Sequence, residues 1–140
     1  PEEQRNTYDI TFPEFDFKMR WNLEDQGQSW LIHPESINEI GCIHTCQGLE
    51  VDYIGVIIGD DFIVRNGEIQ INPAAHPGMD KALQTWKKII KDDPTEGRLR
   101  VEAVIKNTYR TLMSRGMKGC FIYCNDKETA NYFKSKITLG

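Results

Sequence analysis

Polar and apolar residues alternate along the first third of the chain, and this period of two predicts short strands with one buried face. Pro13, Gly27 and Pro34 interrupt the alternation. The alternating stretches cover residues 8–12, 15–21 and 29–32. We therefore expect each of them to form a short strand.

Two later stretches, residues 40–44 and 53–58, are almost continuously apolar. Strands of this kind are usually buried on both faces, as in a parallel sheet that helices cover. Asn66-Gly67 lies between two short apolar stretches and is the strongest short hairpin signal. We therefore expect a mainly parallel sheet with a hairpin over residues 62–71.

A helical period appears in the second half of the chain. Apolar positions over residues 79–90 predict an amphipathic helix that Asp92-Asp93-Pro94 ends. A buried strand is predicted over residues 118–124, and Asn125 with Glu128 is a capping pair for a last helix. A further helix is predicted to end at Gly116. Its buried face would carry Val101, Val104, Ile105, Thr108 and Leu112.

This order of elements predicts an α/β fold, in which a three-layer unit has a mainly parallel sheet and an inserted hairpin. The 140 residues suit a single domain over residues 1–140. With 39% hydrophobic and 27% charged residues, the composition is that of a folded soluble protein and excludes a disordered one.

The charge balance restricts the classes of partner. The chain has 17 basic and 21 acidic residues, a net charge of −4, which excludes a broadly basic nucleic-acid binder but allows a local basic face. The longest apolar run, residues 53–59, is far shorter than the ~20 residues of a membrane span. The first residues do not resemble a signal peptide, so we expect a cytoplasmic protein without a membrane partner.

The four cysteines form two pairs of equal spacing, Cys42-x3-Cys46 and Cys120-x3-Cys124. Residues four apart on a strand share a face, so a tetrathiolate zinc site with His44 as a spare ligand is one interpretation. Both pairs lie in apolar runs, however, and free cysteine packs as a small hydrophobe. We expect reduced thiols and no bound metal.

Two polar segments could bind a ligand. The segment from His44 to Asp52 follows an expected strand, where α/β sheets bind ligands, although a satisfied turn with a core histidine fits the same pattern. Arg110 and Arg115 lie near the end of an expected helix. A guanidinium there could bind phosphate, or it could simply stabilise the helix C-terminus.

A third segment is acidic. Asp60 and Asp61 follow an apolar strand and, together with Glu50 and Asp52, could gather one or two magnesium ions in a nuclease site. Ordinary turn acids in front of a hairpin fit the pattern equally well. Both interpretations stay open at the level of sequence.

The first two segments resemble helicase motifs. The stretch Ile43-His-Thr-Cys-Gln-Gly-Leu-Glu-Val-Asp-Tyr-Ile-Gly-Val-Ile-Ile58 resembles motif V of superfamily 1 helicases. The stretch Thr108-Tyr-Arg-Thr-Leu-Met-Ser-Arg-Gly-Met-Lys118 resembles motif VI, and the two motifs are in the right order. Residues 17–22, 33–42 and 107–120 are similar to the bacterial Schlafen group 3-like DNA/RNA helicase domain, a family of unknown function. The resemblance covers most of the chain.

The resemblance implies a RecA-like, P-loop NTPase-like fold, the second of two such domains, with ATP bound between them. Arg115 would be the catalytic arginine finger at the γ-phosphate, on the C-terminal rim of the sheet with Gly48 and Glu50. The residues implied to contact the nucleotide are Gln47, Gly48 and Glu50. Those implied to lie towards the nucleic acid are His44 and Thr45.

The chain departs from a complete helicase because Gly-x-x-x-x-Gly-Lys-Ser/Thr, the phosphate-holding P-loop, is absent from it. We therefore expect the C-terminal part of a longer ATP-dependent helicase or translocase. Its partners would be DNA or RNA and an upstream P-loop domain of the same chain. ATP and Mg²⁺ would act in the full-length protein, and this part alone would bind neither. The alternatives are the nuclease and a non-catalytic interaction domain.

Overall fold

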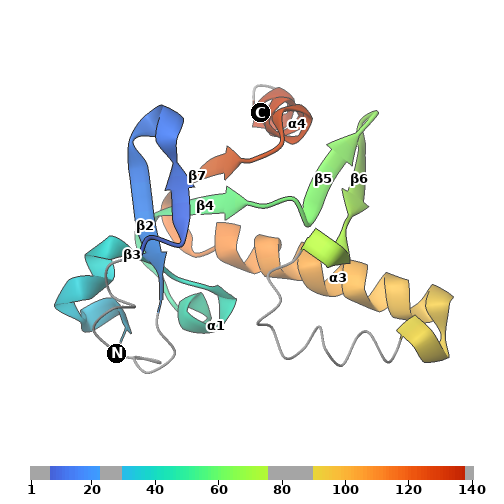
Figure 1. Cartoon of the computed structure of the whole chain (residues 1–140), viewed down its shortest axis with the longest axis horizontal. Coiled ribbons are helices and arrows are strands. Elements are labelled where there is room, and N and C mark those ends of the chain that lie inside the picture. The colour runs from blue at the N-terminus through green and yellow to red at the C-terminus, as the bar shows by residue number, and fades with distance from the viewer. Residues whose placement is uncertain (1–6, 23–29, 76–89, 138–140) are drawn as a thin grey trace. The chain divides into compact units, whose positions relative to one another are not determined.

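The computed structural model describes residues 7–22, 30–75 and 90–137 (Figure 1). The chain divides into two compact units, Pro1–Leu49 and Glu50–Gly140, hereafter the first and second units. The prediction of a single domain over the whole chain stays a prediction.

The first unit contains a three-stranded sheet in the order β1-β2-β3. β1 (Ile10–Phe12) is antiparallel to β2 (Phe17–Trp21), whereas β3 (Glu39–Ile40) is parallel to β2. The short 3₁₀ helix η2 (Pro13–Phe15) joins the two strands of the hairpin. The 3₁₀ helix η4 (Pro34–Asn38) precedes β3, and the one-turn helix α1 (Ile43–Cys46) follows it.

Two of the strands predicted in this unit are wrong. Residues 30–32 form a 3₁₀ turn, in which buried Trp30 donates its indole N–H to the Glu39 carboxylate at 2.9 Å. Instead of a strand over residues 40–44, β3 ends at Ile40 and α1 begins at Ile43. The Thr45 hydroxyl accepts the Cys42 N–H at 2.9 Å, and this local cap favours a helical turn over an extended chain.

The second unit contains the parallel pair β4 (Val51–Ile58) and β7 (Gly116–Cys124), which confirms that strands form over residues 53–58 and 118–124. Figure 1 shows α3 (Pro94–Met113) leading into β7 and α4 (Lys127–Ile137) leaving it. β5 (Phe62–Arg65) and β6 (Glu68–Ile71) form a separate antiparallel sheet. The predicted hairpin is confirmed, since Asn66 and Gly67 both have positive φ angles, 55° and 78°.

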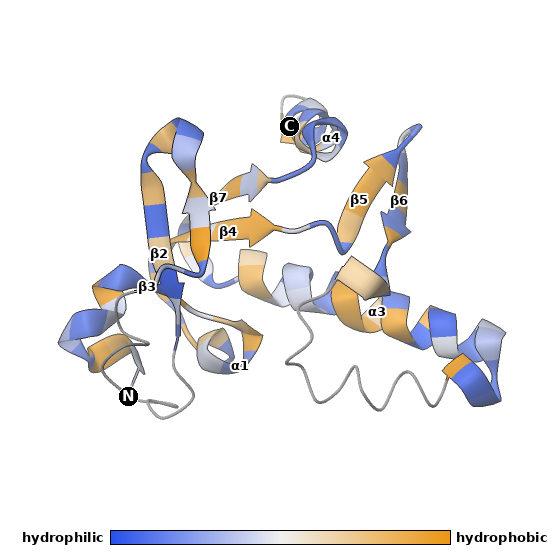
Figure 2. Ribbon diagram, viewed as in Figure 1, coloured by the Kyte–Doolittle hydropathy of each residue, from blue (hydrophilic) through white to orange (hydrophobic). Residues whose placement is uncertain are grey.

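The core of the second unit lies where α3 packs against β4, and residues of β5 and β7 complete it. Figure 2 shows β4 as an almost continuous hydrophobic strand. Tyr53 and Phe121 on the β4–β7 pair are 58% and 69% exposed, so the described residues cover only one of its faces, whereas burial on both faces was predicted. The buried core cluster consists of Val56, Ile58, Phe62, Val101, Ile105, Tyr109 and Cys124.

The helices of this unit differ from the predictions in detail. Val104 is 36% exposed, and Tyr109 takes a place in the buried stripe of α3 that the sequence analysis did not give it. α3 ends at Met113, because Gly116 is already the first residue of β7. Asp126 rather than Asn125 caps α4, since its carboxylate accepts the Thr129 N–H at 2.8 Å.

The helix predicted over residues 79–90 lies, apart from its last residue, outside the described residues. The break predicted at Asp92-Asp93-Pro94 is confirmed, because Asp93 is non-helical and its carboxylate caps α3 by accepting the N–H groups of Thr95 and Glu96. The three-layer RecA-like arrangement stays a prediction.

Candidate functional site

Arg115 lies in the short connection between α3 and β7, and its main chain is held from two sides. Its carbonyl oxygen accepts the Val51 N–H at 3.1 Å, and its own N–H donates to the Leu112 carbonyl at 3.1 Å. The half-buried side chain donates from Nε to the Thr111 carbonyl at 3.1 Å and from Nη2 to the Ser114 hydroxyl at 3.2 Å. The main-chain bonds fix the position of the Arg115 backbone, and the side-chain bonds fix the orientation of its guanidinium.

Glu50 and Arg115 lie at the same edge of the parallel pair. Each directly precedes a strand, and Val51 is the register partner of Gly116. Parallel strands begin at the same edge, so this is the N-terminal edge of β4 and β7. The predicted neighbourhood of Glu50 and Arg115 is therefore confirmed, whereas their placement on the C-terminal rim is wrong. The cause is that the strand expected over residues 40–44, which would have ended at this segment, does not form.

The remaining predicted site residues belong to the first unit. His44 and Thr45 lie on α1; His44 is exposed, and the Thr45 hydroxyl is engaged in the helix cap. Gln47 and Gly48 follow α1 and are exposed. A Cβ at position 48 would have no atom within 4 Å, so no neighbouring group requires glycine there. The backbone φ of Gly48, +82°, is what favours glycine.

The four acidic residues of the nuclease alternative do not come together. Glu50 and Asp52 lie at the start of β4, and Asp60 and Asp61 follow its end. The six strand steps from Asp52 to Ile58 alone span about 20 Å. Within residues 7–22, 30–75 and 90–137, no three His, Cys, Asp or Glu side chains are grouped to hold a metal ion. This geometry contradicts the nuclease alternative.

Two of these carboxylates have other partners. Asp52 accepts a hydrogen bond from Lys118 across the β4–β7 pair at 2.7 Å. Asp61 is 3% exposed and accepts the Tyr109 hydroxyl at 2.6 Å, while the Gly59 N–H donates to the same hydroxyl at 3.1 Å. Burial, and then the carboxylate of Asp61, raise the pKa of Tyr109 well above its usual range.

A second polar cluster that the sequence analysis missed joins the hairpin to α4. Arg65 donates two hydrogen bonds to Asp126, at 2.8 and 2.9 Å, and buried Thr129 accepts the Val64 N–H at 2.9 Å. Arg65 and then Thr129 hold the pKa of Asp126 well below its usual range. These residues are more than sixty positions apart in the sequence, so no local pattern could have paired them.

All four cysteines are free thiols. Cys42 and Cys46 belong to the first unit, and Cys120 and Cys124 to the second. Burial raises the pKa values of Cys46, Cys120 and Cys124, which favours their protonated form. The absence of bound metal stays a prediction.

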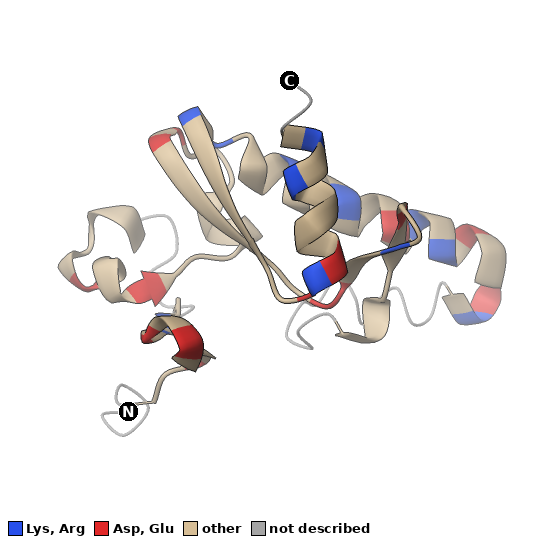
Figure 3. Cartoon of the chain, turned by 90° about the horizontal axis from the view of Figure 1, so that it is seen from above, with Lys and Arg blue, Asp and Glu red and all other residues tan. Residues whose placement is uncertain are grey.

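Arg110 lies on the exposed face of α3, which carries charges of both signs (Figure 3). Glu96 pairs with Arg100 at 2.8 Å, and Glu102 pairs with Lys106 further along the helix. Such a mixed surface is typical of a solvated helix face. Arg110 is therefore a suitable comparison residue for Arg115.

A family model described as "Schlafen group 3, DNA/RNA helicase domain" matches residues 1–126. The chain is 29% identical over 116 residues to the uncharacterized protein YPL245W of Saccharomyces cerevisiae, covering 80% of this chain and 24% of the yeast protein. It thus spans about a quarter of that relative's length. No solved structure matches the chain. Among the described helices, none has the length and apolar character needed to cross a membrane.

Proposed function

The chain belongs to the Schlafen group 3 DNA/RNA helicase domain family, and from this premise we propose that it is the second RecA-like domain of an ATP-dependent helicase or translocase. It would supply the arginine finger and the motif V segment, and an upstream domain would supply the P-loop. The observation that supports this proposal is the hydrogen bond from the Val51 N–H to the Arg115 carbonyl, which holds Glu50 and Arg115 at one edge.

Arg115 has the chemistry that an arginine finger needs. A fixed guanidinium neutralises the charge that develops on the transferring phosphoryl oxygens and is worth ~10³–10⁵ in rate. The hydrogen bonds that Arg115 donates to Thr111 and Ser114 reduce the side-chain freedom that would be lost on reaching the transition state.

The residues at this edge fit part of an ATP site. The exposed carboxylate of Glu50 can accept from a ribose hydroxyl, and Arg115 provides the cation. The 140 residues contain no P-loop, so the phosphates and Mg²⁺ would be held by residues of the upstream domain. ATP and Mg²⁺ together supply the electrophilic phosphoryl group on which Arg115 would act.

The motif V segment would respond to both ligands. Gln47 and Gly48 would contact the nucleotide, and His44 and Thr45 would face the nucleic-acid backbone. Only Leu49 separates Gly48 from Glu50 in the chain. A change at the nucleotide could therefore alter the hold on nucleic acid, which is the coupling that a translocase requires.

The test uses the longer protein that carries this chain. Arg115→Lys keeps the charge but loses the planar fork, so it should lower kcat almost as much as Arg115→Ala, by about 10³-fold or more, with a smaller change in KM. Arg110→Ala on the solvated face of α3 is the matched control and should retain hydrolysis. Loss of hydrolysis in Arg110→Ala together with normal rates in Arg115→Ala would refute the motif VI assignment.

The chain by itself should hydrolyse no ATP, because it lacks the phosphate-holding loop. Purified residues 1–140 can be assayed for phosphate release. Turnover that survives purification and disappears in Arg115→Ala would show a complete site within this chain and contradict the proposal.

A further inference from the structure

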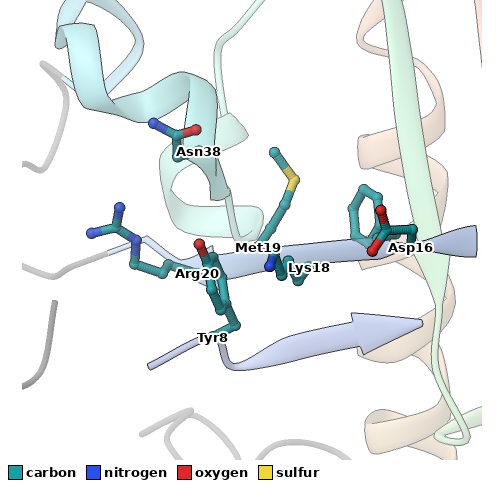
Figure 4. Close-up of a pocket in the computed structure, with 7 residues that line it drawn as sticks. Tyr8, Asp16, Lys18, Met19, Arg20 and Asn38 are labelled. Carbon is teal, nitrogen blue, oxygen red and sulfur yellow. The ribbon is translucent and has the colours of Figure 1, made fainter. Parts of the chain in front are cut away.

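A cavity of about 560 Å³ lies on the β1–β2 hairpin, entirely within the first unit (Figure 4). The proposed ATP chemistry uses none of its residues. Its lining includes Tyr8, Asp16, Lys18, Met19, Arg20 and Asn38. The stretch Phe17–Asn22 carries part of the family resemblance, and several of its side chains line this cavity.

Strand geometry places the two cations of this cavity side by side. Lys18 and Arg20 are two residues apart on β2, so they share a face about 6.6 Å apart. The Asp9 carboxylate accepts the Trp21 N–H at 2.8 Å and holds the bend that precedes β1. This bend brings Tyr8 to the same face, where Lys18 Nζ lies 5.2 Å from the centre of its ring.

Arg20 has no acidic partner among the described residues. Its Nε–H is buried and has no acceptor there. Glu39, its register partner on β3, accepts instead from the Trp30 indole at 2.9 Å. Asp16 lies at the opposite end of the cavity from Arg20. It precedes β2, and the three strand steps from Phe17 to Arg20 alone span about 10 Å. A buried donor without an acceptor is costly, so an anionic ligand would be favoured.

We propose that this cavity binds the backbone of single-stranded nucleic acid, with phosphates at Lys18 and Arg20 and a base stacked on Tyr8. A guanidinium matches phosphate oxygens in a bidentate fork, and a ring that is 47% exposed offers a stacking face to any base. Two cations at strand spacing can contact successive phosphates of an extended strand. The geometry alone favours an anionic ligand, and the inference rests on the proposed function only in taking that anion to be nucleic acid.

The experiment measures binding of the full chain to fluorescently labelled oligothymidine and oligouridine by anisotropy over a range of salt. Each phosphate contact adds about 0.7 to the salt slope for a single strand, which corresponds to about fivefold in affinity at 0.1 M salt. Lys18→Gln with Arg20→Gln should therefore weaken binding about 25-fold and lower the slope by about 1.4. Tyr8→Leu should weaken binding at least about fivefold and leave the slope unchanged.

The chain contains a matched control pair. Lys136 Nζ lies 5.2 Å from the ring centre of Tyr132 on α4, the same spacing as in the Lys18–Tyr8 pair. Lys136→Gln and Tyr132→Leu should leave both the dissociation constant and the slope unchanged. Equal losses in these controls, or no loss in the Lys18 and Arg20 variant, would overturn the inference.

Two further arms complete the test. ATP added as competitor should displace the oligonucleotide poorly, and displacement at equal concentration would mean that the site takes a free nucleotide, contrary to the inference. Lys18→Arg preserves the charge and should retain affinity, which separates phosphate binding from misfolding. ATP hydrolysis by the longer protein is measured in a separate assay. Failure of the arginine-finger proposal can therefore be distinguished from failure of this inference.

Discussion

Replacing Tyr109 with phenylalanine would remove a single hydroxyl from the core of the second unit and leave its ring in place. The ring packs edge-on against Phe62, with centroids 5.4 Å apart, and this contact would remain. The hydroxyl donates to Asp61 at 2.6 Å and accepts from the Gly59 N–H at 3.1 Å. The variant therefore isolates two hydrogen bonds.

The cost follows from the burial of the groups left behind. A hydrogen bond to a charged group contributes about 1.5–3 kcal/mol, and a buried N–H without an acceptor costs about 1 kcal/mol. Asp61 is 3% exposed, and it has a further interaction that lessens the loss. We expect Tyr109→Phe to lower the free energy of unfolding by about 2–4 kcal/mol.

The assay is a urea titration of the chain followed by far-UV circular dichroism. Tyr132→Phe, on the half-buried face of α4, is the control and should change the free energy of unfolding by less than about 0.5 kcal/mol. A double-mutant cycle with Asp61→Asn should give a coupling energy of about 0.5–3 kcal/mol. Additive effects of the two substitutions, or a Tyr109→Phe variant as stable as the control, would refute the assigned hydrogen bonds.

The raised pKa of Tyr109 also makes the stability of the folded chain depend on pH in the alkaline range. The pKa of Tyr109 in the folded chain is raised above the usual value of about 10 in an unfolded chain. Its contribution to stability is therefore full below about pH 10 and is lost as the pH rises towards the folded pKa. Tyr109→Phe should remove this part of the alkaline decline, and an unchanged profile would contradict the raised pKa.

Three other predictions concern acid stability, the hairpin and the thiols. Because the pKa of Asp126 is lowered in the folded chain, its stabilisation should be full above about pH 4 and fall below it, and Asp126→Asn should flatten an acid titration of unfolding. Gly67→Ala forces a positive φ on a Cβ-bearing residue and should cost about 1 kcal/mol in urea unfolding, whereas Gly55→Ala, with nothing within 4 Å of the new Cβ, should cost nothing. Elemental analysis should find no zinc, and Cys46 and Cys124 should react with iodoacetamide only after unfolding; stoichiometric zinc would contradict this.

Local patterns in the sequence were sufficient to predict most elements of the second unit. β4, β7, α3, α4 and the hairpin were expected from apolar runs, helical periods and Asn66-Gly67. These signals are strong because the period of apolar residues and the turn residues act over short stretches of sequence. They did not fix every buried position, since Val104 is 36% exposed and Tyr109 is buried. The same reasoning failed over residues 30–32 and 40–44. Trp30 is fixed by Glu39, and the Thr45 cap favours a helical turn, so neither outcome follows from hydrophobicity.

The sequence also determined the candidate site residues, through the spacing of the two helicase-like motifs and the absence of a P-loop from the 140 residues. Only the tertiary structure decided that Glu50 and Arg115 lie at the N-terminal edge of the strand pair, because the edge depends on which strands form and pair. It also separated the acidic residues to the two ends of β4. Finally, it joined Asp61 to Tyr109 across the core, a pairing that chain packing creates and that residues so distant in sequence cannot signal locally.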